Sequence, residues 1–240
     1  MKTLAAQKNE LNYKKGLIEL DRLIAIGDIH GCVHTLKNLL NRVDYNSQND
    51  TLVFIGDYID RGNFSYETVE FIKHLQNQVG KDKVICLRGN HEQMAIEAMD
   101  VGYDGVWLSN GGGSTLLSYE RNGVDPRNHI SWFKSLPIVY DTPEILFCHA
   151  GLSNPKLENN TVEDLIWGRD WIKRDSEHRE KQVVFGHTPS KDGRAYVTNT
   201  EDICIDAGCV FGGNLCALVI EEDGISQCEY EPKSDDDVLS

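Results

Sequence analysis

Side chains that commonly bind metal ions follow five short apolar segments of this chain. They occur in the phrases Gly27-Asp28-Ile29-His30-Gly31, Gly56-Asp57-Tyr58-Ile59-Asp60-Arg61-Gly62, Gly89-Asn90-His91-Glu92, His149-Ala150-Gly151 and Gly186-His187-Thr188. Oxygen and imidazole ligands without thiolate suit Mn, Fe or Zn better than Ca. A carboxylate such as that of Asp57 can bridge two cations, and two ions about 3.5 to 4 Å apart suit in-line displacement at phosphorus. The pattern therefore predicts a metal site with a catalytic role.

The apolar segments before these phrases have the length and composition of buried strands. They cover residues 23–26, 52–55, 84–87, 145–148 and 183–185. Apolar runs of four or five residues bounded by glycine are typical of strands that are covered on both faces. In open α/β sheets, ligands bind outside the carboxyl ends of the strands. The five phrases are therefore expected to meet at one edge.

The order of the remaining elements predicts an α/β fold with four layers. Helices are expected at 33–43, 65–78 and 92–99, between strands that would form a parallel sheet. A glycine-punctuated region, 101–136, predicts short helical pieces that cap the site. Further strands are expected at 138–140, 145–148, 183–185, 196–197, 203–205, 215–220 and 227–230. These would form a second, mixed sheet that faces the first, giving an α-β-β-α sandwich with helices outside.

The predicted organisation is one catalytic domain with two short flanking segments. Residues 1–21 are expected to be a lead-in with a short helix, residues 22–230 the catalytic domain, and residues 231–240 an acidic, disordered tail. The net charge of -14 argues against nucleic-acid binding. No apolar stretch has the length of a membrane span, and the N-terminal residues lack the apolar core of a signal peptide. Seven scattered cysteines without a C-x-x-C pair suit a reduced, cytoplasmic protein.

Taken together, the five phrases resemble the metallophosphoesterase superfamily. Within it, the chain is similar to the PPP serine/threonine protein phosphatases of compact bacterial and bacteriophage λ type. The resemblance runs from Gly27 to Thr188, and residues 205–215 resemble the strand–loop–strand that closes the family's core. It implies two divalent metal ions, with Mn favoured over Fe and Zn. Asp28, His30 and Asp57 would bind the first ion, and Asp57, Asn90, His149 and His187 the second.

The resemblance also implies roles around the metal ions. His91 would be the general acid, and Asp60 would accept from the other ring nitrogen and fix its tautomer. Three arginines, Arg61, Arg88 and Arg169, would bind phosphate oxygens through their planar guanidinium groups. Each arginine could instead belong to an ordinary charged surface, an alternative that the sequence leaves open.

Three functions are compatible with this pattern. The first is hydrolysis of phosphoserine and phosphothreonine in proteins, with phosphotyrosine left open, by attack of a hydroxide bound to the two ions. The second is symmetric hydrolysis of dinucleoside tetraphosphates by a related branch. That branch typically has Ala in place of Asp60 and Asp in place of Glu92, so both residues favour the protein phosphatases. The third is a phosphate-binding module without catalysis, in which a ligand would usually be missing. The expected partner is a phosphoprotein substrate, with neither nucleic acid nor membrane.

Overall fold

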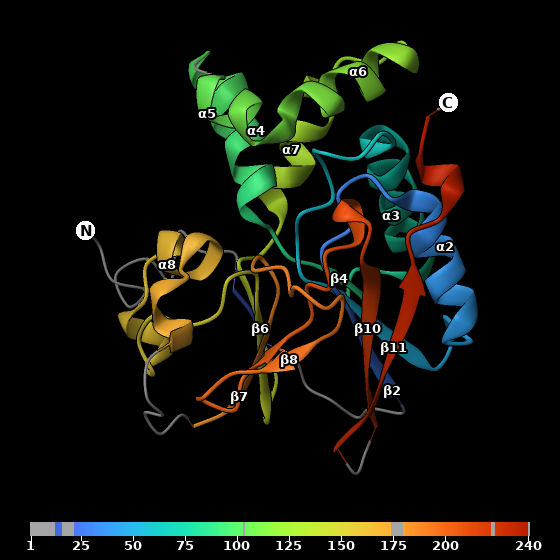
Figure 1. Cartoon of the computed structure of the whole chain (residues 1–240). Coiled ribbons are helices and arrows are strands. Elements are labelled where there is room, and N and C mark those ends of the chain that lie inside the picture. Colours follow the sequence, from blue (N-terminus) through green and yellow to red (C-terminus); the bar gives the residue numbers. More distant parts are fainter. Residues whose placement is uncertain (1–12, 16–21, 103, 174–179, 222–223, 240) are drawn as a thin grey trace.

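Two mixed sheets pack face to face, with helices on their outer sides. The computed structural model describes residues 13–15, 22–102, 104–173, 180–221 and 224–239 (Figure 1). One sheet has five strands in the order β11-β10-β2-β3-β4, and the other has six in the order β1-β5-β6-β7-β9-β8. The predicted four-layer α-β-β-α sandwich is confirmed.

The five-stranded sheet contains the first three predicted strands. β2 (Arg22–Ile26), β3 (Asp50–Phe54) and β4 (Val84–Cys86) are parallel. β10 (Asn214–Glu221) runs antiparallel to β2, and β11 (Gly224–Pro232) runs antiparallel to β10. The prediction that these last two strands belong to the second sheet was wrong. Six successive buried residues, 215–220, mark β10 as a central strand, but that pattern does not say which sheet contains it.

The six-stranded sheet contributes the other predicted ligand strands. It comprises β1 (Tyr13–Lys15), β5 (Val139–Asp141), β6 (Ile145–Cys148), β7 (Gln182–Phe185), β8 (Tyr196–Val197) and β9 (Ile203–Cys204). β6, β7 and β9 are parallel, whereas β5 and β8 run antiparallel to their neighbours β6 and β9. Within the predicted lead-in, residues 13–15 form a strand parallel to β5. The rest of the predicted lead-in lies outside the described residues.

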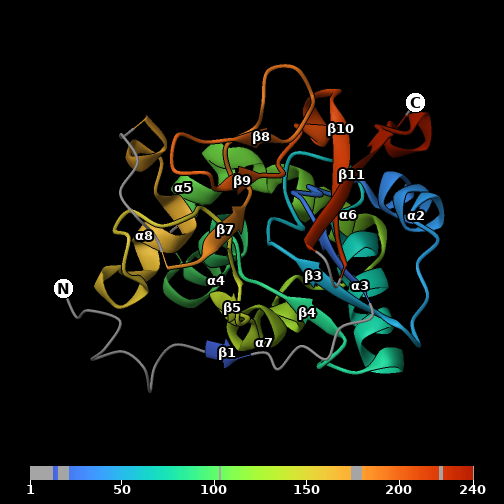
Figure 2. The same ribbon diagram turned by 90° about the horizontal axis from the view of Figure 1, so that it is seen from below.

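Alternating side chains of the strands build two different cores. In β2, Leu23 and Ala25 belong to the apolar core between the sheets, whereas Ile24 and Ile26 belong to the core under the helices. That outer core also includes residues of α2 (Val33–Arg42), α3 (Ser65–Val79) and α4 (Asn90–Val101). On the far side, α8 (Val162–Trp167) covers the six-stranded sheet (Figure 2).

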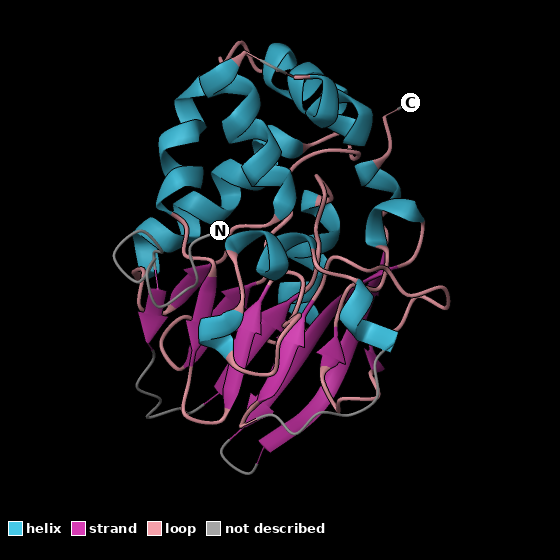
Figure 3. Ribbon diagram, turned by 90° about the vertical axis from the view of Figure 1, so that its left-hand side faces the viewer, coloured by secondary structure: helices cyan, strands magenta, loops and turns pink. Residues whose placement is uncertain are grey.

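The glycine-punctuated region is helical, as predicted. It contains α5 (Gly105–Trp107), a wide turn over Leu108–Gly112, α6 (Gly113–Arg121) and α7 (Arg127–Ser135). The wide turn is broken at Gly111, whose φ of 102° lies in the left-handed region. These helices gather over one end of the strands (Figure 3). Shorter helical turns cover Leu157–Asn159, Asp170–Lys173, Cys209–Phe211 and Asp235–Asp237.

The prediction of a disordered tail is wrong for residues 231–239. β11 continues to Pro232, and the turn Asp235–Asp237 follows it beside α2 (Figure 1). The Asp237 side chain is completely buried. The acidic composition indicated disorder. It could not show that one of the acids, Asp237, is buried against the backbone N–H groups of α2.

Candidate metal centre and catalytic dyad

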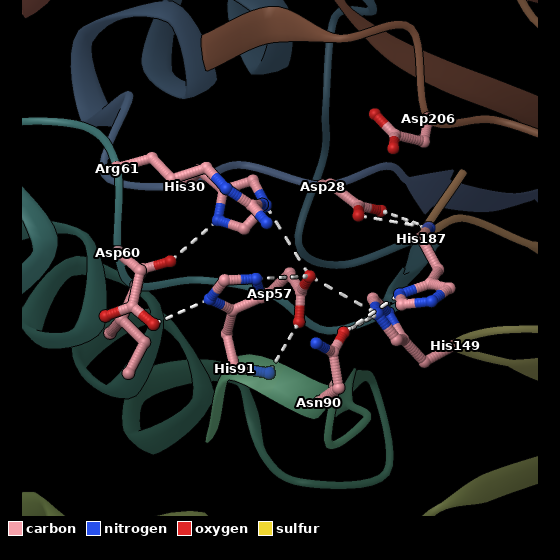
Figure 4. A network of polar contacts seen from close by, with 12 residues as sticks. Asp28, His30, Asp57, Asp60, Arg61, Asn90, His91, His149, His187 and Asp206 are labelled. Carbon is pink, nitrogen blue, oxygen red and sulfur yellow. Dashed lines mark hydrogen bonds and ion pairs between the residues drawn. The ribbon is translucent and has the colours of Figure 1, made fainter. Parts of the chain in front are cut away.

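The predicted metal ligands meet at one edge of the two sheets (Figure 4). Asp28 follows β2, Asp57 follows β3, and Asn90 begins α4 just after β4. From the other sheet, His149 follows β6 and His187 follows β7. All of these side chains and that of His30 are at most 4% exposed. The structure therefore brings together every residue that the sequence predicted as a ligand.

Sharp backbone turns after the strands direct these side chains. Seven described residues other than glycine have a positive φ, and five of them are predicted site residues: His30, Asp57, Asp60, Arg61 and His187. Such a backbone is unfavourable for residues with a Cβ atom and is concentrated at functional sites in proteins. The backbone is thus locally strained where the predicted site residues follow the strands.

Two glycines make room for the carboxylates. A Cβ atom at Gly89 would lie 2.1 Å from Oδ1 of Asp57, and one at Gly186 would lie 2.1 Å from Oδ1 of Asp28. Both separations are far below van der Waals contact. Glycine is therefore required at these two positions because the carboxylates pack directly against the backbone.

Asp57 lies at the centre of the cluster. Its Oδ2 atom is 3.5 Å from Nε2 of His30, 3.8 Å from Nε2 of His91 and 3.3 Å from Nε2 of His149. Its Oδ1 atom accepts a hydrogen bond of 3.1 Å from the backbone N–H of His91. Asp57 belongs to two groups of closely spaced potential ligand atoms, one with His30 and His91 and one with His149 and His187. This position fits a carboxylate shared by two ions.

The hydrogen bonds of His149 leave it a lone pair that needs a positive charge. Nδ1 of His30 lies 2.7 Å from the carbonyl of Ile59, and Nδ1 of His149 lies 3.0 Å from that of Ile55, so in each ring Nδ1 is the donor. Nε2 of His149 then presents a lone pair 2.9 Å from Oδ1 of Asn90. Acceptors this close repel one another unless a cation or proton lies between them. The donor set therefore fits a metal ion.

His187 gives a second indication of the same kind. Its Nδ1 atom lies 2.9 Å from Oδ1 of Asn90, the same oxygen that faces His149. Its Nε2 atom is buried and makes no hydrogen bond among the described residues. The backbone N–H of His187 donates to Asp28 at 3.0 Å, which joins the loops of the two sheets. Asn90, His149 and His187 thus present a convergent set of oxygen and nitrogen atoms.

The charges of the protein alone are unbalanced at this edge. Burial raises the pKa of Asp28 well above its usual value and that of Asp206 to about 6. Burial would lower the pKa of His149, but the Asp57 carboxylate raises it to about 9. Burial also opposes ionisation of Asp57, yet the facing imidazoles of His149 and His91 hold its pKa well below normal. A cation bound here would supply the positive charge that these carboxylates lack.

His91 and Asp60 form a buried pair beside this cluster. Nδ1 of His91 lies 2.6 Å from Oδ2 of Asp60. Asp60 also accepts hydrogen bonds from the indole N–H of Trp107 at 2.9 Å and from the hydroxyl of Thr115 at 2.6 Å. Burial raises the pKa of Asp60 to about 8 and lowers that of His91 to about 4. Both shifts favour the uncharged form of the pair, which retains a proton at neutral pH.

The three predicted phosphate-binding arginines occupy different places. The Arg61 guanidinium contacts Nε2 of His30 and lies 5.5 Å from the ring centroid of Phe211. Arg169 donates to the backbone carbonyl of His187 at 2.9 Å. Arg88 donates to the side chain of Gln93 on α4 at 3.1 Å. Arg61 and Arg169 therefore border the ligand cluster directly, and Arg88 is held at the helix that begins with Asn90.

Four residues that support the site were not predicted as part of it. Glu92, buried in α4, accepts from the backbone N–H groups of Asp57, Tyr58 and Gly89 at 2.8 to 2.9 Å. Trp107 and Thr115 come from the helical region 104–136 and hold Asp60. Asp206 follows β9 and is 5% exposed. The position of Asp206 directly after a strand could have indicated a site residue, whereas no local sequence pattern indicates that Trp107 or Thr115 contacts the site.

Comparisons with known proteins identify the family. The chain is 30% identical to serine/threonine-protein phosphatase 1 of Salmonella typhimurium, over 82% of this chain and 90% of that protein. It is 29% identical to an asymmetrical bis(5'-nucleosyl)-tetraphosphatase, PrpE, of Anoxybacillus flavithermus, over 80% of this chain and 88% of that one. The structure resembles a cold-active protein-tyrosine phosphatase of Shewanella with a TM-score of 0.65, at 18% identity and covering 92% and 82% of the two chains. No helix among the described residues is long and apolar enough to cross a membrane. The family model of the calcineurin-like phosphoesterases matches residues 21–220, and the chain belongs to that family.

Proposed function

We propose that this phosphoesterase removes phosphate from phosphoserine and phosphothreonine in proteins, with phosphotyrosine as a further substrate. The observation that carries the proposal is the buried His91–Asp60 pair, 2.6 Å apart, beside the ligand cluster. A serine alkoxide is strongly basic and leaves only when it receives a proton. A histidine oriented by a carboxylate supplies that proton, so the pair suits a difficult leaving group.

The ligand cluster would hold two divalent ions. Asp28, His30 and Asp57 would bind one, and Asp57, Asn90, His149 and His187 the other. When bound, such a pair supplies activated water at neutral pH and neutralises charge on the phosphoryl oxygens. Mn is our first choice over Fe and Zn, because the cluster offers oxygen and imidazole donors without thiolate.

The remaining side chains would orient the phosphoester and move the proton. Asp60 fixes the His91 ring, whose Nε2 atom faces Asp57 at 3.8 Å and would donate its proton to the leaving oxygen. Arg61 and Arg169, next to His30 and His187, would bind phosphate oxygens with their guanidinium groups. Arg88 would join them from the base of α4.

A second candidate is hydrolysis of dinucleoside tetraphosphates. The similarity to PrpE proteins, which are named asymmetrical tetraphosphatases, favours it. The sequence predicted symmetric cleavage as the alternative function. Because the PrpE proteins are named asymmetrical enzymes, asymmetrical cleavage replaces it as the second candidate. A nucleotide leaves as a stabilised anion and needs little help from a general acid, so the His91–Asp60 pair would be less important for it. A binding module without catalysis has less support because every predicted ligand is present.

One comparison of substrates tests the proposal. We would measure kcat/KM of the Mn-reconstituted protein for a phosphoserine peptide, a phosphotyrosine peptide and diadenosine tetraphosphate under one metal condition. We expect the phosphoserine peptide to exceed the dinucleotide. Asp28→Asn provides the background rate. A clear preference for diadenosine tetraphosphate would overturn the protein phosphatase assignment and leave the predicted metal ligands standing.

A further inference from the structure

The C-terminal turn provides a cap that helix α2 does not have in its own sequence. Cys32, at the N-cap position, makes no capping hydrogen bond with its side chain, and the first turn of α2 contains no acid. Asp237, about 200 residues later in the chain, takes this place. Its Oδ1 accepts from the backbone N–H of His34 at 3.0 Å, and its Oδ2 accepts from that of Thr35 at 2.8 Å. A carboxylate is a favoured group at a helix N-terminus, where the N–H groups lack partners.

Further hydrogen bonds hold the Asp237 cap, and the cap is buried. The Thr35 hydroxyl donates to Oδ2 of Asp237 at 2.6 Å and accepts from the backbone N–H of Ser234 at 2.9 Å. Asp237 and Thr35 are both completely buried, whereas the neighbouring Asp235 and Asp236 are exposed. Only one of the three successive acids of the tail is therefore enclosed by α2.

The capped helix begins directly after a metal-binding loop. Val33, its first residue, is three positions beyond His30 and five beyond Asp28. The loop is itself joined to the next one, because the backbone N–H groups of Ile29 and His30 donate to the carbonyl of Asp57 at 3.1 and 2.9 Å. Any displacement of the start of α2 would thus move Asp28 and His30 relative to Asp57.

The same tail segment also contacts the two other loops on this side. The carbonyl of Asp237 accepts from the side-chain amide of Asn63 at 3.1 Å, two residues after Arg61. Lys233 donates through its backbone N–H to the carbonyl of Gly213 at 3.2 Å and through Nζ to that of Val210 at 3.0 Å. Both acceptors lie in the loop that follows Asp206. Residues 233–237 therefore join three loops that are distant in sequence and carry site residues.

We propose that Asp237 is a positioning residue of the metal centre. By capping α2 and binding Asn63, it fixes the loop of Asp28 and His30 against the loop of Asp57, Asp60 and Arg61. The inference rests on the metal centre of the proposed function and is independent of the choice of substrate. Asp237 itself touches no predicted ligand and acts only through α2 and Asn63.

The test measures metal binding by the full-length, metal-free protein, without substrate. We would titrate Mn²⁺ into the wild type, Asp237→Ala and Asp235→Ala by calorimetry. Mutation of a residue that is hydrogen-bonded to a metal ligand commonly lowers the metal affinity about 10- to 100-fold. Because Asp237 lies one step further away, we expect one of the two sites to weaken about 10-fold in Asp237→Ala. Asp235→Ala removes an exposed acid from the same turn and should bind Mn²⁺ like the wild type.

Amide hydrogen exchange gives a second readout, at the positions through which Asp237 would act. In Asp237→Ala the amides of Ile29, His30 and Thr35 should exchange at least about tenfold faster, as expected for local opening of a less stable segment. If Asp237→Ala does not fold, Asn63→Ala removes the bond to the Asp237 carbonyl alone, and it should weaken the same site by a smaller factor.

Two results would overturn the inference. In the first, Asp237→Ala unfolds at a lower temperature but binds both Mn²⁺ ions with wild-type affinity, which would give Asp237 a purely structural role. In the second, the wild type binds no Mn²⁺, which would remove the metal centre as well. A preference of the wild type for dinucleotides over phosphopeptides would affect only the substrate assignment.

Discussion

At the scale of single residues, His91 should matter for proton transfer and not for metal binding. In His91→Asn, we expect the metal content to stay the same and kcat for a phosphoserine peptide to fall about 100-fold or more, the usual contribution of a general acid. The loss should be smaller for p-nitrophenyl phosphate, because nitrophenolate leaves without a proton. Steady-state kinetics with both substrates, alongside metal analysis, measure this.

His74 offers a matched control because it is an exposed histidine on α3. His74→Asn should leave both rates unchanged. An equal loss for both leaving groups in His91→Asn would mean that His91 positions the substrate and does not donate a proton.

The two hydrogen-bond partners of Asp60 that the sequence did not predict, Trp107 and Thr115, should affect the same proton transfer. Trp107→Phe keeps an aromatic ring but removes the indole N–H that donates to Asp60, and Thr115→Val removes the hydroxyl. Removing one partner of a buried hydrogen bond costs about 1–3 kcal/mol, and only part of this should reach the transition state. We expect about a tenfold lower kcat for the phosphoserine peptide in each variant, with KM little changed. Trp132→Phe is the control, since the Trp132 indole donates to Gln76 and not to Asp60.

That the candidate ligands lie together could be predicted from the sequence, whereas the residues that hold them in place could not. Asp57 and His149 directly follow apolar runs, so topology alone brings them to one edge. Trp107 lies in a short helix among many polar and glycine residues, and its contact with Asp60 depends on how the helices of residues 104–136 pack over α3 and α4. A local pattern carries no information about such packing.

At the scale of elements, the first turn of α4 joins two strand-end loops through Glu92. Its carboxylate accepts three backbone hydrogen bonds, two from the loop after β3 and one from Gly89. Glu92→Gln keeps the shape but replaces one acceptor oxygen with an amide group that cannot accept. We expect the free energy of unfolding to fall by about 1–3 kcal/mol, the cost of leaving a buried donor unpaired. Urea unfolding of the metal-free variant measures this.

Glu97 tests whether the loss comes from the buried position. It lies on the same helix but is exposed, so Glu97→Gln should change the free energy of unfolding by less than about 0.5 kcal/mol. A similar loss in both variants would mean that Glu92 acts through the charge of α4 and not through its bonds to the loops.

Sequence patterns placed most elements correctly but not all of their neighbours. The expected helix 33–43 corresponds to α2, Val33–Arg42, since its apolar spacing fits one buried face. The pairing of β10 with β2 and the docking of the tail on α2 involve residues about 200 positions apart. Nothing in a local window selects such pairings, because they depend on which surfaces remain uncovered when the rest has folded.

At the scale of the whole molecule, buried negative charge should couple stability to metal binding. Asp28, Asp57 and Asp206 are at most 5% exposed and lie at the same edge, in a chain whose net charge is -14. Carboxylates gathered in this way repel one another and are poorly solvated. The metal-free protein should therefore be the less stable form, and its loss of activity on chelation should be reversed by added metal.

This coupling predicts the size of the stabilisation by Mn²⁺. A ligand at 100 times its Kd stabilises the folded state by about 2.7 kcal/mol per site, so two sites should add about 5 kcal/mol. Thermal unfolding of the metal-free protein at increasing Mn²⁺ should show a rising Tm, and metal analysis should find two ions per chain.

Asp57→Asn should lose most of this rise in Tm, because Asp57 faces both ligand groups. Asp192→Asn, an exposed change, should keep it. One ion or none in fully active protein would contradict the two-metal centre. A full rise in Asp57→Asn would show that Asp57 does not bridge the ions.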